Sequence, residues 1–163
     1  MSSSAPLFKA DLLARLVSLQ SGGLSGVMVS WGNPYPNRMQ SELVMISKVT
    51  PANSPGDTPR GLGINARDER YQLKVIASVI GRPRDSQQTL EERAFAIHDT
   101  VVNSLVAWRS ETPPFGGRLG NGWITIGSPE TDEGMTFDPA TKQPIEREAA
   151  VIINIEVVAR VNI

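Results

Sequence analysis

Two long segments with alternating apolar residues constrain the fold of this chain more than any other feature of its sequence. In the first, from Glu69 to Ile80, the alternate apolar positions are Tyr71, Leu73, Val75, Ala77 and Val79. In the second, from Glu148 to Ile163, they are Val151, Ile153, Ile155, Val157 and Val161. A period of two residues predicts β-strands, so both segments are expected to be strands with one apolar face.

The predicted strand at 148–163 is much longer than usual. Its 16 residues would span ~50 Å at ~3.3 Å per residue, whereas an ordinary strand spans ~17–20 Å. Either such strands curl into a hairpin closed within one subunit, or part of each extends beyond its own sheet. An overhanging strand leaves backbone N–H and C=O groups unpaired, and we favour their pairing with a neighbouring subunit.

The remaining pattern predicts two helices and three further strands. Leucines at helical spacing predict a helix from Pro6 to about Leu19, and a second helix follows the candidate N-caps Asp85 and Ser86 and runs to about Arg109. The buried stripe of the second helix is expected to be Leu90, Ala94, Ile97, Val101, Leu105 and Trp108. Shorter strands are expected at 26–31, 41–49 and 123–127, with Trp123 in the core.

The order α-β-β-β-α-β-β predicts one α+β domain over residues 1–163. Its mixed or antiparallel β-sheet is expected to be covered on one face by the two helices. Residues 1–5 are expected to form a loose tail, residues 51–68 a long flexible loop, and residues 128–144 a polar loop excursion.

Apolar and aromatic residues on the predicted loops are candidates for a subunit interface. Those on the 51–68 loop either order against a partner or fold back over their own sheet. The aromatic residues beside turns either anchor an interface or plug the ends of the core. The candidate interface residues are Trp31, Tyr35, Arg60, Leu62, Ile64, Arg67, Phe115 and Arg118.

Composition excludes several classes of chemistry and partner. The chain has no cysteine, which excludes disulfides, thiolate nucleophiles and cysteine-ligated metals. Its formal net charge of −1 gives no overall attraction for nucleic acid or an anionic membrane, and it removes one barrier to self-association. Residues 1–24 do not resemble a signal peptide, and no stretch reaches the ~18–20 apolar residues of a membrane span.

No motif for catalysis, a metal or a cofactor stands out. His98 is the single histidine and lies inside a predicted helix, where a satisfied or surface role is expected. The acidic stretch Glu130, Asp132, Glu133 and Asp138 lacks EF-hand spacing, so we interpret it as a solvated loop or as a partner for a neighbour's arginines. Neither 61–63 nor 116–117 matches a phosphate-binding glycine loop. We therefore expect no enzyme activity, no cofactor and no metal.

Several segments follow one another in a recognisable order. An N-terminal amphipathic helix leads to a Trp-Gly-Asn-Pro turn at 31–34. The segments after the turn are Ser-Glu-Leu-Val-Met-Ile at 41–46, Arg-Tyr-Gln-Leu-Lys-Val-Ile at 70–76, Glu-Glu-Arg-Ala-Phe-Ala-Ile at 91–97, and Ile-Ile-Asn-Ile-Glu-Val-Val-Ala-Arg-Val at 152–161. In this order of elements and in their apolar pattern, the chain resembles the tail terminator proteins of long-tailed bacteriophages.

The resemblance implies a structural virion protein that is assembled in the host cytoplasm and acts in the tail and neck. Proteins of that family form rings, here expected to be hexameric, that cap the head-proximal end of the tail tube and end its polymerisation. The implied partners are further copies of the chain, the tail tube protein and the head–tail connector. Genomic DNA would pass through the lumen without sequence-specific binding, and no membrane is involved.

Two other functions remain open from the sequence. The first is another neck or head-completion protein, which differs from a terminator only in the partner it binds. The second is a small-ligand-binding or catalytic α+β domain, for which Tyr71, His98 and Glu156 are scattered candidate residues. A pocket with convergent polar groups would favour this second alternative.

Overall fold

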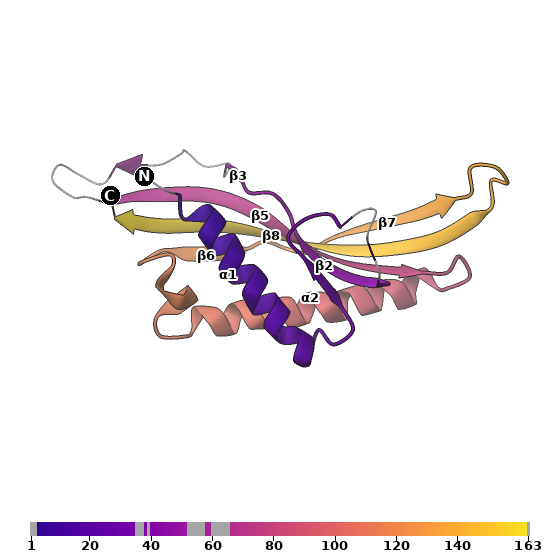
Figure 1. Cartoon of the computed structure of the whole chain (residues 1–163), viewed down its shortest axis with the longest axis horizontal. Helices are drawn as coiled ribbons and strands as arrows, with labels where there is room; N and C mark the ends of the chain where they lie inside the picture. The colour runs from indigo at the N-terminus through magenta and orange to yellow at the C-terminus, as the bar shows by residue number, and fades with distance from the viewer. Residues whose placement is uncertain (1–2, 35–37, 39, 52–57, 60–65, 163) are drawn as a thin grey trace.

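The computed structural model of the chain describes residues 3–34, 38, 40–51, 58–59 and 66–162. The predicted α+β class is confirmed, with two α-helices and one mixed β-sheet (Figure 1). The α-helices are α1 (Ala5–Ser18) and α2 (Gln87–Arg109), and short 3-10 turns follow them at η1 (Leu19–Ser21) and η2 (Pro114–Gly117). The strands are β1 (Met28–Ser30), β2 (Glu42–Ile46), β3 (Thr50–Pro51), β4 (Thr58–Pro59), β5 (Ala66–Gly81), β6 (Trp123–Ile126), β7 (Glu130–Phe137) and β8 (Pro144–Asn162).

The two long strands predicted from the sequence pair with each other. β5 and β8 run antiparallel through an unbroken register that extends from Ala66 opposite Asn162 to Gly81 opposite Arg147. The main path of the sheet is β1-β2-β5-β8-β6, and only the β1–β2 pair is parallel. Both long strands curve along their length (Figure 1). The backbone groups that the two strands direct at each other are therefore paired within one subunit.

The predicted loop at 128–144 is wrong for its residues 130–137, which form strand β7. β7 pairs antiparallel with the first half of β8, from Glu130 opposite Ile152 to Phe137 opposite Pro144. β6 pairs with this edge of β8 only at residues 155–158. The same edge is therefore free at residues 144–152, where β7 pairs with it. Backbone pairing to an available strand edge, and not an apolar pattern, makes these polar residues a strand.

One face of the sheet carries the core. The buried cluster joins alternate residues of β5 and β8 with the apolar stripes of both helices, so both helices cover the same face, as expected. On α2 the buried residues include every position predicted from the sequence: Leu90, Ala94, Ile97, Val101, Leu105 and Trp108. The opposite face has no helix over it, and its residues Gln72, Lys74 and Asn154 are half-buried or exposed.

Four aromatic rings from separate segments hold α1 against this core. The Phe8 ring stacks on Trp108 at 5.5 Å between centroids, and its edges meet Tyr71 and Phe115 at 6.3 and 6.4 Å. Phe115 is 1% exposed, so its side chain belongs to the core. The alternative expectation, that Phe115 anchors an interface, is wrong. Its backbone lies in the left-handed region with φ of 53°, which a bulky residue keeps only where packing holds it.

The predicted loose tail at 1–5 is wrong for its last residues. Ser4 is buried, and both its backbone N–H and its hydroxyl donate to Glu69 Oε2 at 2.7 Å. The Ser3 hydroxyl donates to the same oxygen at 3.3 Å. A buried carboxylate on β5 thus satisfies the start of α1, which begins at Ala5. Residues 1–2 lie outside the described part of the chain.

Two further expectations need correction. The predicted loop at 51–68 is too long at both ends, because Pro51 pairs with β5 and β5 itself begins at Ala66. Within the predicted loop, Thr58–Pro59 also pairs with β5. Residues 52–57 and 60–65 lie outside the described residues. Trp123 is 42% exposed and is not in the core. It lies opposite Val158 on the face without helices, and the Arg160 guanidinium stands 5.5 Å from its ring centre.

Replacing Phe8 by alanine should cost about 3–5 kcal/mol of unfolding free energy, because it removes the ring that joins Trp108, Tyr71 and Phe115. Urea denaturation measures the change. The neighbouring Leu7, which is 46% exposed, is the matched control. Leu7→Ala should change stability by less than about 0.5 kcal/mol. Equal losses for the two variants would contradict this account of how α1 is held.

The phenol of Tyr71 should lose its proton at a higher pH than an ordinary tyrosine does. Burial, with the nearby Glu69 carboxylate acting in the same direction, raises the pKa of Tyr71 to about 12. The folded state thus favours the neutral phenol, and stability should fall as the pH rises from about 10 towards 12. The chain has two tyrosines, so tyrosinate absorbance of a Tyr35→Phe variant reports Tyr71 alone. A midpoint near 10 while circular dichroism still shows the folded protein would contradict the assignment.

Candidate functional site

The most exposed element of the fold is the hairpin formed by β7 and the start of β8. We call residues 130–148 the arm. All eight residues of β7 are exposed, and among the described strands β7 pairs with β8 alone. The arm extends past the start of α2 at one end of the molecule (Figure 1). Since β5 ends at Gly81 opposite Arg147, the outer part of the arm is a two-stranded ribbon.

Three large apolar side chains of the arm are exposed to solvent. Met135 is 38% exposed, Phe137 53% and Ile145 48%. Met135 lies opposite Arg147 and shares the face of the sheet on which α2 packs. Ile145 precedes Arg147 by two residues, so the two side chains lie on the same side of β8. The face that carries the core therefore continues onto the arm, where Met135 and Ile145 lie on the same side as the charged Glu133 and Arg147, and neither described helix covers its outer part.

The opposite face of the arm is acidic. The register places Glu130 opposite Ile152, Asp132 opposite Ala150, and Glu148 opposite Gly134, all pointing away from the helices. Arg38 reaches the inner end of this face, where its Nη1 donates to Ser78 Oγ at 2.9 Å and Ser78 Oγ donates to Glu148 Oε1 at 3.0 Å. Burial lowers the pKa of Arg38, while Glu148 and Glu146 act against that shift.

The expected solvated acidic loop is thus an acidic strand face. Its carboxylates project from neighbouring positions of β7 and β8 and do not converge on one point. Among the residues that the structure describes, no group of three or more His, Cys, Asp or Glu side chains is placed to hold a metal ion. The arrangement suits the pairing of carboxylates with basic groups of another molecule, as the sequence interpretation also allowed.

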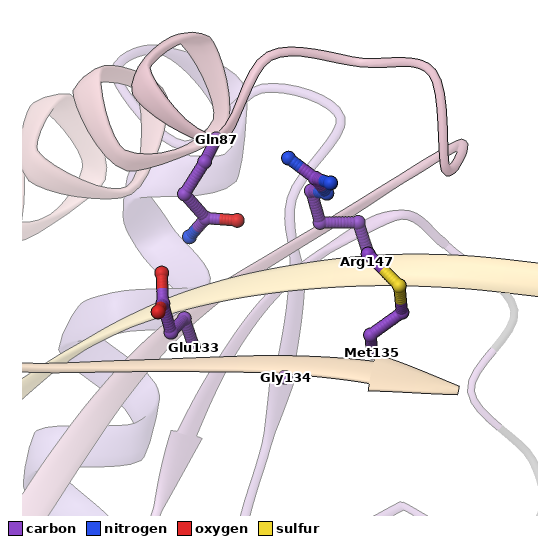
Figure 2. Close-up of a pocket in the computed structure, with 5 residues that line it drawn as sticks. All are labelled: Gln87, Glu133, Gly134, Met135 and Arg147. Atoms are coloured by element: carbon purple, nitrogen blue, oxygen red, sulfur yellow. The ribbon is translucent and has the colours of Figure 1, made fainter. Parts of the chain in front are cut away.

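A pocket of about 330 Å³ lies where the arm meets α2. Figure 2 shows Gln87 reaching down from the first turn of α2 while Glu133 and Met135 rise from β7 and Arg147 from β8. Gln87 Nε2 and Arg147 Nε are buried donors, and neither has a hydrogen-bond partner within the described part of the chain. The lining offers one carboxylate, one guanidinium and one amide, with no nucleophile beside a base. It can hold a polar group but has no arrangement for covalent catalysis.

Two of the predicted interface residues lie beside α1. Trp31 is 45% exposed, and Lys9 Nζ stands 4.3 Å from its ring centre. Burial lowers the pKa of Lys9. Arg118 is held by Asp11, whose Oδ2 accepts from Arg118 Nε at 2.7 Å. Trp31 is therefore available to a partner, whereas Arg118 already has an ion pair within the subunit.

The other predicted interface residues are either buried or outside the described residues. Phe115 is in the core. Arg67 belongs to β5, where it pairs with Pro59 and Val161, and its side chain is not described. Tyr35, Arg60, Leu62 and Ile64 lie outside the described residues.

Sequence reasoning missed Met135, Phe137 and Ile145. Their signal is weak, because the apolar residues of 130–137 are only two and its other positions are polar or glycine.

The three scattered candidates for a small-ligand site do not come together. Tyr71 is buried on the helix-covered face, while Glu156 lies on the other face opposite Gln72 and Thr125. His98 is buried within α2, where its Nδ1 lies 2.9 Å from Asp99 Oδ1 and its ring meets the edge of Phe95. His98 is thus a satisfied histidine, as expected from the sequence.

Neither of the described helices is long and apolar enough to cross a membrane.

Comparison with known protein families and with the sequences of curated proteins finds no match to this chain. The arm and the pocket at its base are therefore interpreted from their own geometry. That geometry is an exposed strand pair with large apolar side chains and with acidic groups on one of its faces.

Proposed function

We propose that this protein is a structural subunit that assembles with copies of itself into a ring, expected to be hexameric. The ring caps the head-proximal end of a phage tail tube, ends tube polymerisation and joins the tail to the head-side connector. The observation that carries the assembly role is the arm, whose eight-residue strand β7 is exposed along its whole length and which exposes the large apolar side chains of Met135, Phe137 and Ile145.

Physical reasoning about exposed strands supports an assembly role. An isolated two-stranded hairpin is marginally stable in water, and an exposed strand edge offers unpaired backbone groups to other chains. The outer arm has both features, and Phe137 at its end is 53% exposed. A second molecule that covers this ribbon would remove its apolar surface from water and would pair its free edge.

The resemblance to tail terminators supports the phage part of the proposal. The segments that carry it fall on elements of the fold that are central to the sheet and its helix layer: β2, β5, α2 and β8. The function is one of binding and geometry, in which the ring ends the tube because its outer face does not accept another tube ring. DNA passes through the lumen, and no covalent step occurs.

Native mass spectrometry across a concentration series, with negative-stain images of the same sample, tests the proposal. We expect a hexamer with a central hole, and binding of that hexamer to the ends of isolated tail tubes. Binding to connector rings without any binding to tubes would indicate the neck-protein alternative. A chain that stays monomeric at high concentration and also ignores tail tubes would contradict the proposal.

A further inference from the structure

A second hollow lies at the end of the molecule opposite the arm. It measures about 360 Å³ and sits between the last turns of α2 and the edge strand β6. Four of its six lining residues are apolar, although polar atoms supply the larger part of its exposed lining, and Val106 on its rim is 41% exposed. The lining residues are Leu105, Val106, Arg109, Ile124, Thr125 and Ile126, which we call the acceptor hollow.

One wall of the acceptor hollow is a sheet edge. Among the described strands, β6 pairs with β8 alone, so the other side of Trp123–Ile126 is an edge. An exposed edge beside such a hollow can receive an extended segment of another chain. The backbone of that segment pairs with the edge, and its alternate side chains enter the hollow.

We propose that the arm of one copy of this chain docks in the acceptor hollow of a second copy. Met135, Phe137 and Ile145 then contact the apolar wall formed by Val106, Ile124 and Ile126. Glu133, which lies on the same side of β7 as Met135, then comes near Arg109 on the rim. This inference rests on the proposed ring function and identifies the two surfaces that join its subunits.

Charge favours a second copy as the occupant. The arm holds six of the chain's 17 acidic residues and two of its 16 basic residues, so the arm carries a net charge of −4 and the rest of the chain +3. A strongly acidic segment is thereby attracted to the body of another copy, at a contact that includes Arg109. The chain's total charge of −1 conceals this separation.

Geometry excludes the copy's own arm as the occupant. The arm projects beyond the start of α2, whereas β6 and the end of α2 lie at the other end of the long axis (Figure 1). Each copy therefore presents one arm and one hollow at opposite ends. Such a head-to-tail contact forms a closed ring where the rotation between copies closes, and an open filament where it does not.

Cross-linking between two engineered cysteines tests the contact directly. The chain has no cysteine of its own, so a Val106→Cys, Phe137→Cys double variant carries one thiol on each surface. Both positions are exposed, at 41% and 53%, so the fold should tolerate the changes. With a short bismaleimide we expect a ladder of covalent oligomers on denaturing gels. Each single-cysteine variant should give no ladder beyond a dimer.

A matched pair of serine variants measures the strength of the contact. Phe137→Ser should raise the concentration at which oligomers form by about tenfold or more, as expected for a buried aromatic anchor. Leu7→Ser changes a comparably exposed apolar residue, 46% against 53%, on α1 away from both surfaces. It should leave assembly unchanged, and circular dichroism confirms that both variants are folded.

The outcomes separate this inference from the proposed function. Rings without a cross-linked ladder, together with wild-type assembly of Phe137→Ser, would overturn the arm–hollow contact and leave the ring function standing. A ladder from open filaments that never close or bind tubes would support the contact and overturn the ring function. A chain that does not cross-link, stays monomeric at high concentration and also ignores tail tubes would overturn both.

Discussion

The antiparallel pairing of β5 with β8 is the interaction on which the rest of the structure depends. Its register runs from Ala66–Asn162 to Gly81–Arg147 without a break and fixes which residues face the helices. A shift of β8 by one residue against β5 would turn Ile153 out of the core. The other edge of β8 receives β6 and β7. One strand thus connects the core to the exposed arm.

The sequence predicted the parts of the fold that have an apolar period. The alternation in β5 and β8 and the helical stripe of α2 reflect burial on one face, so pattern alone located them. It could not locate β7, which has no buried face and forms because a free edge of β8 accepts it. Nor could it foresee that Glu69, distant in sequence, would fix Ser4. These features depend on tertiary neighbours and leave no local period.

The candidate surface was harder to predict than the fold for the same reason. Trp31 was identified by its place beside a turn, and it is exposed. Trp123 and Phe115 were assigned to the wrong environments, because a short strand at a sheet edge and a turn after a helix give no local measure of burial. Met135, Phe137 and Ile145 come together as exposed apolar residues only when the hairpin pairs the two ends of this segment.

The same long ladder has a mechanical consequence. Hydrogen bonds of an antiparallel pair lie perpendicular to the strands, so a pull along β5 and β8 loads the whole β5–β8 ladder at once, in shear. The outer arm beyond Gly81 has only two strands, and a sideways pull at its tip opens β7 from β8 one bond at a time, like a zipper. The β5–β8 pair should therefore resist force better than the outer arm does. A force along the two strands is shared by all hydrogen bonds of their ladder, whereas a sideways force at the tip of the arm breaks the β7–β8 bonds first.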